Sequence, residues 1–421
     1  MRGDITGLVI PAHPDAFAAA GETFLTTAFH AFGMLPADNA VTRIVAIEPC
    51  DGGSTGKKMF LTVEYAKPAP GLRTDLFVKF SRDLDDERRD LQRDEMQSEA
   101  AFTWVSHAPG FPIHVPRGYF ADYHADSGTG IVITERIAFG SSSIQPHRPK
   151  TMDHRTMDNP ISFYRAIIQA LGKLAGTHKA GRLASMVGER LSFDPMTGSA
   201  DPIAHDAMAL EALLDHVRDF TRHHPQLLPE ELRTPEFLES LARGARHIRA
   251  NEKSLRSALL PSLDYVALCH WNAHVDNCWF WTEEDGELAC GFLDWGRVGQ
   301  ITFGSAIWGA LCAAHHDVWD THLDDLLTLF SDEVLASGGP AIRPDQLYRH
   351  LMLHIAVMGI ARVLSLLPYV MIRLPAAAKA SGPLDPMFEQ NERARSSLHV
   401  YTIFAKLWKR HELERLVCRI S

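Results

Sequence analysis

Apolar residues recur with two different spacings along the chain. Within residues 41–137 they alternate with polar residues or form short runs, which is typical of strands. We predict about five strands in this region, at residues 41–49, 59–65, 75–80, 116–123 and 130–137. Between the third and fourth strands, residues 85–108 carry an apolar stripe at helical spacing, formed by Met96, Ala100, Trp104 and Ala108. Beyond residue 160 the helical spacing dominates.

This order of elements predicts an α+β protein in which a small antiparallel sheet precedes a large helical part. A helical stripe that includes Phe17 and stops at Gly33 gives an N-terminal helical extension over residues 1–40. The sheet and its helix then occupy residues 41–137. The segment 140–160 is rich in Ser, Pro, His and Asp and is expected to form a loop. It lies at the start of a helical domain that we place at residues 138–421.

Composition and charge exclude one class of function. The chain has 421 residues, of which 46% are apolar, and its formal charge is −10. A chain of this length can bury a large core. No nucleic-acid partner is expected, because proteins that bind nucleic acids need a basic surface. The sequence does not indicate an oligomeric state.

The chain is expected to have no membrane partner and to lie in the cytoplasm. Its N-terminal residues lack the apolar stretch of a signal peptide. The most apolar run, residues 351–367, contains His354 and Arg362 and is too short to span a membrane. The six cysteines form no C-x-x-C pair, so we expect reduced, buried thiols.

A polar loop followed by a hairpin is the clearest candidate for chemistry. The apolar runs 278–281 and 290–293 flank an acidic turn and predict a β-hairpin. The loop before it contains His270, Asn272 and Asn277, and Asp294 follows the hairpin. Mg²⁺ in nucleotide sites takes one or two protein oxygen ligands beside phosphate and water. Asn277 and Asp294 offer such oxygen atoms.

A second candidate is a lysine within a strand. Lys79 lies in the apolar segment 75–80, where a buried ammonium is costly unless an acid pairs with it. Glu95 and Glu99 lie one turn apart on the following helix. We expect Glu99 to be the partner and Glu95 to lie on a solvated face. A strand lysine paired with a helix glutamate is the arrangement that binds nucleotide phosphates in kinases.

The spacing of the polar loop resembles that of the kinase-like small-molecule phosphotransferases. This group includes the aminoglycoside phosphotransferases, choline kinases and ecdysteroid-kinase-like proteins. Their loop reads His-Gly-Asp-x-His/Trp-x-x-Asn and is followed by a hairpin and an Asp-Trp/Phe pair. The matching residues here are His270, His274, Asn277, Asp294 and Trp295. The resemblance spans roughly residues 20–310 and implies a two-lobed protein-kinase-like fold.

The resemblance also implies a nucleotide site that takes ATP or another nucleoside triphosphate with Mg²⁺. Lys79 would contact the α- and β-phosphates and Glu99 would orient it, while His274 would lie near the γ-phosphate. Strand 130–137 would run into the hinge between the lobes, where the main chain binds the adenine edge. The implied binding residues are Gly53, Ser54, Thr55, Lys79, Glu99, Glu135 and Ile137, with Asn277 and Asp294 for the metal. The glycine-rich turn at residues 51–57 could also be an ordinary hairpin turn.

The chain departs from the family pattern at the catalytic position. Asn272 stands where the family has the aspartate that acts as general base, and an amide cannot accept a proton. Three hypotheses follow. The protein is a slow kinase or one served by another base such as Asp276, a nucleotide-binding protein without phosphotransfer, or an enzyme that transfers a different group from ATP.

The expected acceptor is a hydroxyl on a small molecule. Five of the eight tryptophans lie in or just after the loop and hairpin, and Trp271 replaces the glycine of the family pattern. If Trp271 faces the acceptor, an apolar or aromatic alcohol fits best, although a cation could also bind over the indole ring.

Overall fold

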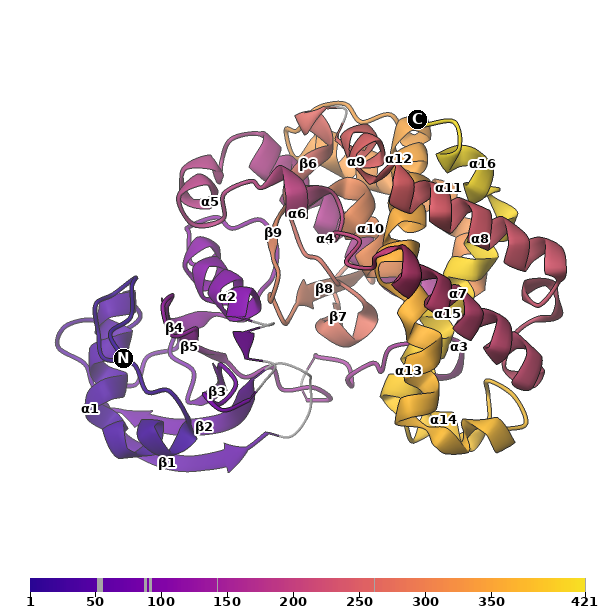
Figure 1. Cartoon of the computed structure of the whole chain (residues 1–421). Coiled ribbons are helices and arrows are strands. Elements are labelled where there is room, and N and C mark those ends of the chain that lie inside the picture. The colour runs from indigo at the N-terminus through magenta and orange to yellow at the C-terminus, as the bar shows by residue number, and fades with distance from the viewer. Residues whose placement is uncertain (51–55, 87–88, 91–92, 142, 261, 421) are drawn as a thin grey trace. The chain divides into compact units, whose positions relative to one another are not determined.

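The computed structural model describes residues 1–421 except 51–55, 87–88, 91–92, 142, 261 and 421. The chain divides into two compact units. The first unit comprises Met1–Pro146, Leu183–Ser192 and Trp279–Gly299, and the second comprises His147–Arg182, Phe193–Cys278 and Gln300–Ser421. The sheet belongs to the first unit, whereas most of the helices belong to the second (Figure 1).

The first unit contains a five-stranded antiparallel sheet with the order β1-β2-β3-β5-β4. Its strands are β1 (Val41–Pro49), β2 (Lys57–Tyr65), β3 (Asp75–Phe80), β4 (Gly118–His124) and β5 (Thr129–Glu135). Helix α2 (Arg93–Ser106) connects β3 to β4. The α+β class, with a small sheet followed by a mostly helical region, is therefore confirmed.

Two predicted boundaries are wrong. Helix α2 begins at Arg93 rather than at residue 85. Before it, the buried Arg89 donates to the Ser127 carbonyl and the Thr129 hydroxyl, which ties this residue to the turn between β4 and β5. Strand β5 ends at Glu135 instead of residue 137, so Ile137 lies beyond the sheet.

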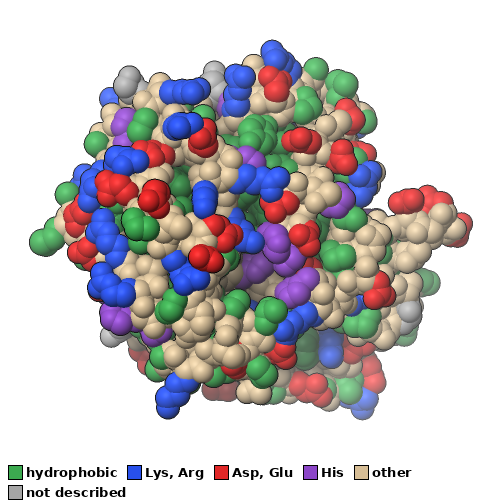
Figure 2. Space-filling model, turned by 90° about the vertical axis from the view of Figure 1, so that its right-hand side faces the viewer, with side chains coloured by type: hydrophobic (Ala, Val, Ile, Leu, Met, Phe, Trp, Pro, Cys, Tyr) green, Lys and Arg blue, Asp and Glu red, His purple; other side chains and the backbone are tan. Residues whose placement is uncertain are grey.

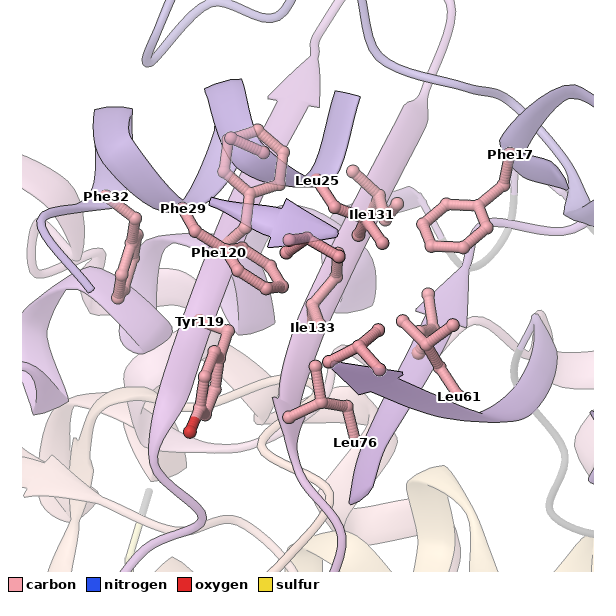
Figure 3. Packing of buried hydrophobic residues seen from close by; sticks show 14 of the residues in the cluster. Phe17, Leu25, Phe29, Phe32, Leu61, Leu76, Tyr119, Phe120, Ile131 and Ile133 are labelled. Carbon is pink, nitrogen blue, oxygen red and sulfur yellow. The ribbon is translucent and has the colours of Figure 1, made fainter. Parts of the chain in front are cut away.

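Helix α1 (Pro14–Phe32) covers one face of the sheet. It begins after His13, which accepts a hydrogen bond from the Ala16 amide, and it ends at Gly33 in the left-handed conformation, with φ 82°. Figure 3 shows its apolar side chains meeting those of the strands. The labelled residues of this core are Phe17, Leu25, Phe29 and Phe32 from α1, and Leu61, Leu76, Tyr119, Phe120, Ile131 and Ile133 from the sheet.

Helix α2 covers the opposite face of the same sheet. Met96 and Ala100 pack with Val132, whereas Ile131 and Ile133 face α1, because successive strand residues point to opposite faces. The same alternation decides where Lys79 points. Its neighbours Val78 and Phe80 lie in the α1 core, so Lys79 faces α2.

The hairpin predicted around the acidic turn is confirmed as β7 (Cys278–Thr282) and β8 (Leu288–Phe292). Gly291 allows its close packing, because a Cβ there would lie 2.1 Å from the Trp279 ring. The sequence did not reveal a second short pair, β6 (Val266–Cys269) with β9 (Gly299–Thr302). Four residues are too few for an alternation to stand out.

The remaining elements are helices. They are α3 (Asp153–Thr156), α4 (Pro160–Lys179), α5 (Ala184–Arg190), α6 (Pro195–Ser199), α7 (Ala207–His223), α8 (Pro235–Ala250), α9 (Glu252–Leu259), α10 (Phe303–Leu311), α11 (His316–Ala336), α12 (Pro344–Ala361), α13 (Leu366–Arg373), α14 (Pro386–Glu389), α15 (Glu392–Arg410) and α16 (Leu413–Val417). Among the described residues, no single helix has the length and apolar composition to cross a membrane. Two helices bent by 44°, Pro344–Ala361 and Val363–Arg373, meet that criterion only together.

Candidate functional site

The first unit holds a buried lysine between two carboxylates. Lys79 Nζ lies 2.5 Å from Glu99 Oε2 and 2.7 Å from Asp294 Oδ1. The Lys79 side chain is 3% exposed, that of Glu99 11% and that of Asp294 40%. The predicted pairing of Lys79 with Glu99 is therefore present, and Asp294 joins it from a position 215 residues away in the sequence.

Helix α2 positions both carboxylates. Glu99 lies on its sheet-facing side, and Phe102 follows three residues later on the same side. The Trp295 ring stacks on Phe102 with a centroid distance of 3.7 Å and an interplanar angle of 15°. The Trp295 indole also donates to the Phe292 carbonyl at 2.9 Å, which ties the residue after Asp294 to the end of β8.

The backbone at Asp294 adopts an uncommon conformation. Its φ is 55°, in the left-handed region that few residues other than glycine adopt, with asparagine and aspartate frequent among them. The Trp295 stack and the contact with Lys79 hold the residue and fix the orientation of its carboxylate.

Charge and burial oppose each other at the lysine. Burial acts to lower the pKa of Lys79, but the charges of Asp294 and Glu99 raise it overall, so the ammonium stays protonated. Burial raises the pKa of Glu99, and Lys79 opposes that effect. The ammonium thus lies between two carboxylates, of which Asp294 is the more exposed.

Three charged neighbours of this cluster, Lys58, Glu95 and Arg297, were not among the predicted site residues. Lys58 is the direct pairing partner of Lys79 across β2 and β3, so both lysines share the face toward α2. Burial and the charge of Lys79 lower the pKa of Lys58. Glu95 is half-buried, and burial raises its pKa while Arg297 lowers it, so the prediction of a solvated face for Glu95 is wrong. The polar alternation along β2 was the signal that could have revealed Lys58.

The second unit holds the polar loop. The buried His270 accepts a hydrogen bond from the Asn272 amide through Nδ1 at 3.1 Å. Asn277, at the end of the short 3-10 helix η5 (Val275–Asn277), donates through Nδ2 to the Asn272 carbonyl at 3.0 Å. Gly309 on α10 lets the loop backbone approach, because a Cβ there would lie 1.8 Å from the Trp271 carbonyl oxygen. These contacts fix the loop from three sides.

Asn272 presents an unsatisfied acceptor. Its Oδ1 is buried and has no hydrogen-bond partner in the described part of the chain. Native structures seldom leave a buried acceptor unpaired, so such an atom calls for a ligand group or water. Asn277 uses its amide nitrogen within the loop, which leaves its Oδ1 for an external partner. An amide oxygen can accept a hydrogen bond or coordinate a cation.

Asp276 lies in an ion-pair network. Its Oδ1 is 2.9 Å from His274 Nδ1 and its Oδ2 is 3.3 Å from Lys150 Nζ. Lys150 also lies 3.4 Å from Glu392. Burial acts to raise the pKa of Asp276, but His274 and Lys150 lower it overall. Lys150 was missed because it stands in a segment with the composition of a loop.

The other predicted residues lie elsewhere. The Glu135 carboxylate accepts from the Arg117 amide at 2.9 Å and lies 3.3 Å from Arg73, while its own amide donates to the Arg117 carbonyl. Its main-chain N–H is thus engaged within the sheet rather than open to an adenine edge. Ile137 is half-buried beyond β5. The predicted phosphate-contacting residues Gly53, Ser54 and Thr55 fall outside the residues that the structure describes.

Solved structures of small-molecule kinases are similar to this chain. The choline kinase of Cryptosporidium parvum Iowa II matches with a TM-score of 0.43 and 12% identity, over 88% of this chain and 91% of that chain. The spectinomycin phosphotransferase in complex with ADP and spectinomycin matches with a TM-score of 0.41 and 14% identity, over 88% and 94%. The Plasmodium vivax ethanolamine kinase matches with a TM-score of 0.39 and 13% identity, over 82% of this chain and 83% of that chain.

No protein-family model matches the chain, and no curated protein matches it. At identities and TM-scores this low, the structural similarities assign neither a family nor an activity.

Proposed function

We propose that this chain is an ATP- and Mg²⁺-dependent phosphotransferase that acts on a hydroxyl group of a small molecule. The observation that carries the proposal is the buried Lys79, held by Glu99 and Asp294. A buried ammonium with two carboxylates is costly as a purely structural device, because desolvation offsets much of the attraction between the charges. The same three groups are what a metal-bound triphosphate requires.

Each residue has a definite role in this proposal. Lys79 binds phosphate oxygens, and Glu99 keeps its ammonium group oriented toward them. Asp294 and Asn277 would hold Mg²⁺, which neutralises phosphate charge when it is bound. The exposure of Asp294 supports its part in this assignment.

Asn272 aligns the acceptor without removing its proton. Its orphan Oδ1 can accept a hydrogen bond from a hydroxyl group. General-base assistance is typically worth about 10²–10⁴-fold, so an amide at this position gives a slow enzyme while the positioning and charge terms remain. We therefore expect the Asn272→Asp variant to be faster than the native protein.

Asp276 acts on the loop rather than on the acceptor. Both of its oxygen atoms are engaged, one by His274 and one by Lys150, and a carboxylate with a lowered pKa binds protons weakly. We assign it the task of orienting the His274 ring, whose Nδ1 it faces.

Our proposal for the class of acceptor rests on Trp271. Trp279, Trp295 and Trp308 are buried core residues, so they do not indicate a substrate. Trp271, in the loop itself, is only half-buried. An apolar or aromatic alcohol against this indole is the acceptor that we propose.

The alternative function is nucleotide binding without phosphotransfer, as in a pseudokinase-like sensor. Asn272 is the observation that favours it, because the family position for the base carries no proton acceptor.

Nucleotide binding is tested first. ATP with Mg²⁺ should raise the melting temperature of the native protein, and Lys79→Ala should abolish the shift. Lys67→Ala is the matched control, since Lys67 is exposed, paired with Asp38 and outside the candidate site. No shift at saturating nucleotide would contradict both the proposed function and its alternative.

Transfer is tested second, by ATP consumption with a library of small alcohols and by mass spectrometry of the products. A product that carries phosphate supports the kinase, and one that carries AMP indicates a different group transfer. If Asn272→Asp binds ATP yet stays inert across the library, the non-transferring alternative gains.

A further inference from the structure

Histidine side chains gather on one face of the molecule (Figure 2). In the second unit, three histidine rings lie close together where α3 meets the start of α11. The centroids of His315 and His316 are 4.0 Å apart, and those of His154 and His315 are 4.9 Å apart. Neither the polar loop nor the Lys79 cluster uses any of these rings.

The potential ligand atoms of this cluster converge. One ligand atom each from His315, His316 and Asp317 lies within 4.8 Å of the other two. His315 Nδ1 is 3.1 Å from one Asp317 carboxylate oxygen, and His316 Nε2 is 3.4 Å from the other. The two imidazoles therefore face one carboxylate from different sides, and a single ion between them would meet two nitrogens and one oxygen.

A buried carboxylate supports the cluster from behind. Asp153 is fully buried, and its Oδ2 accepts from the His315 amide at 2.8 Å and from the Tyr164 hydroxyl at 2.9 Å. Its Oδ1 lies 3.6 Å from His154 Nδ1 and has no hydrogen-bond partner within the described residues. Through the hydrogen bond from the His315 amide, Asp153 fixes the backbone from which the His315 ring extends.

The chemistry of the donors selects the ion. The cluster offers two imidazole nitrogens and one carboxylate oxygen. Imidazole nitrogen suits transition metals, whereas Mg²⁺ and Ca²⁺ prefer oxygen. The start of α11 carries partial positive charge, which opposes a cation, and Asp317 in its first turn supplies the compensating charge.

We propose that His315, His316 and Asp317 bind a divalent transition-metal ion such as Zn²⁺, with a fourth position open to water. His154 and Asp153 are positioning residues for this site. Two histidines and one carboxylate with one open position form a ligand set that zinc accepts in proteins. This site is independent of the proposed nucleotide site.

The test uses the full chain, freed of metals by a chelator, and titrates it with Co²⁺ and Zn²⁺. Native protein should bind one ion per chain, with visible absorption bands of the Co²⁺ complex and with Zn²⁺ binding in calorimetry. His315→Ala and Asp317→Asn should each remove the bands. Asp153→Asn should weaken Zn²⁺ binding less than these two variants, because Asp153 holds only the backbone of His315.

His216→Ala is the matched control, because His216 is an exposed histidine on α7 in the same unit. It should bind like the native protein, and so should Lys79→Ala, which separates this site from nucleotide binding. Circular dichroism confirms that each variant is folded. The proposal is overturned if native protein shows no saturable binding at micromolar Co²⁺ or Zn²⁺, or if His315→Ala binds as well as His216→Ala.

Discussion

Replacing Lys79 with methionine tests whether its ion pairs are truly buried. The substitution keeps the length of the side chain but leaves the carboxylates of Glu99 and Asp294 without their ammonium. Removing one partner of a buried pair typically costs about 3–5 kcal/mol, because the remaining charge stays desolvated. Asp294 is 40% exposed and can recover water, so most of this cost falls on Glu99.

The cost should depend on pH with a definite sign. Burial already raises the pKa of Glu99, and the loss of Lys79 raises it further. A carboxyl group whose pKa is raised on folding favours the folded state only while it is protonated. The destabilisation of Lys79→Met should therefore be small at low pH and grow as the pH rises through the raised pKa of Glu99.

Urea unfolding followed by tryptophan fluorescence measures this effect at two pH values. Glu99→Gln in the Lys79→Met background removes the unpaired charge and should restore much of the lost stability, which a double-mutant cycle quantifies. An exposed ion pair contributes less than about 1 kcal/mol, so a loss of unfolding free energy below this value for Lys79→Met at neutral pH would indicate an exposed pair. That result, or a failure of Glu99→Gln to rescue, would refute a desolvated ion pair at this position.

Three further outcomes are expected. Lys58 shares a sheet face with Lys79, so Lys58→Ala should weaken ATP binding by about tenfold through the loss of one attractive charge, while Lys67→Ala leaves it unchanged in the same calorimetric titration. Phe102→Ala should cost about 3–5 kcal/mol in urea unfolding and also weaken Mg²⁺-dependent nucleotide binding, because Trp295 loses its stacking partner. The pKa of Asp276 is lowered on folding, so its contribution to the free energy of unfolding is present above pH 3.8, the unfolded pKa, and is lost as the pH falls. Asp276→Asn should therefore lose less stability in acid than the native protein does, as urea unfolding at several pH values would show.

The sheet could be predicted from the sequence because its physical signals are local. Alternation marked the strands, and a lysine inside an apolar strand required an acid on the next helix, which led to Glu99. The N-terminal helix was also visible as a stripe. Its packing against the sheet was not, because a stripe does not say which surface it will cover.

The long-range contacts of the site had no such signal. Asp294 reaches Lys79 only after the chain has returned to the first unit, and Lys150 pairs with Asp276 from a segment that has no periodicity. Glu95 and Glu99 look alike in the sequence. They differ in the structure because Glu99 faces the sheet directly, while Glu95 sits a turn earlier, beside Gly296.

The stack of Trp295 on Phe102 has a mechanical consequence. Phe102 and Glu99 are three residues apart on one rigid helix. Glu99, which pairs with Lys79, and Phe102, which supports Asp294 through Trp295, therefore move together. A substitution that rotates α2 even slightly would disturb Lys79 and Asp294 at once. The effects of such changes on the two residues would be coupled, and their combined effect would depart from the sum of the separate ones.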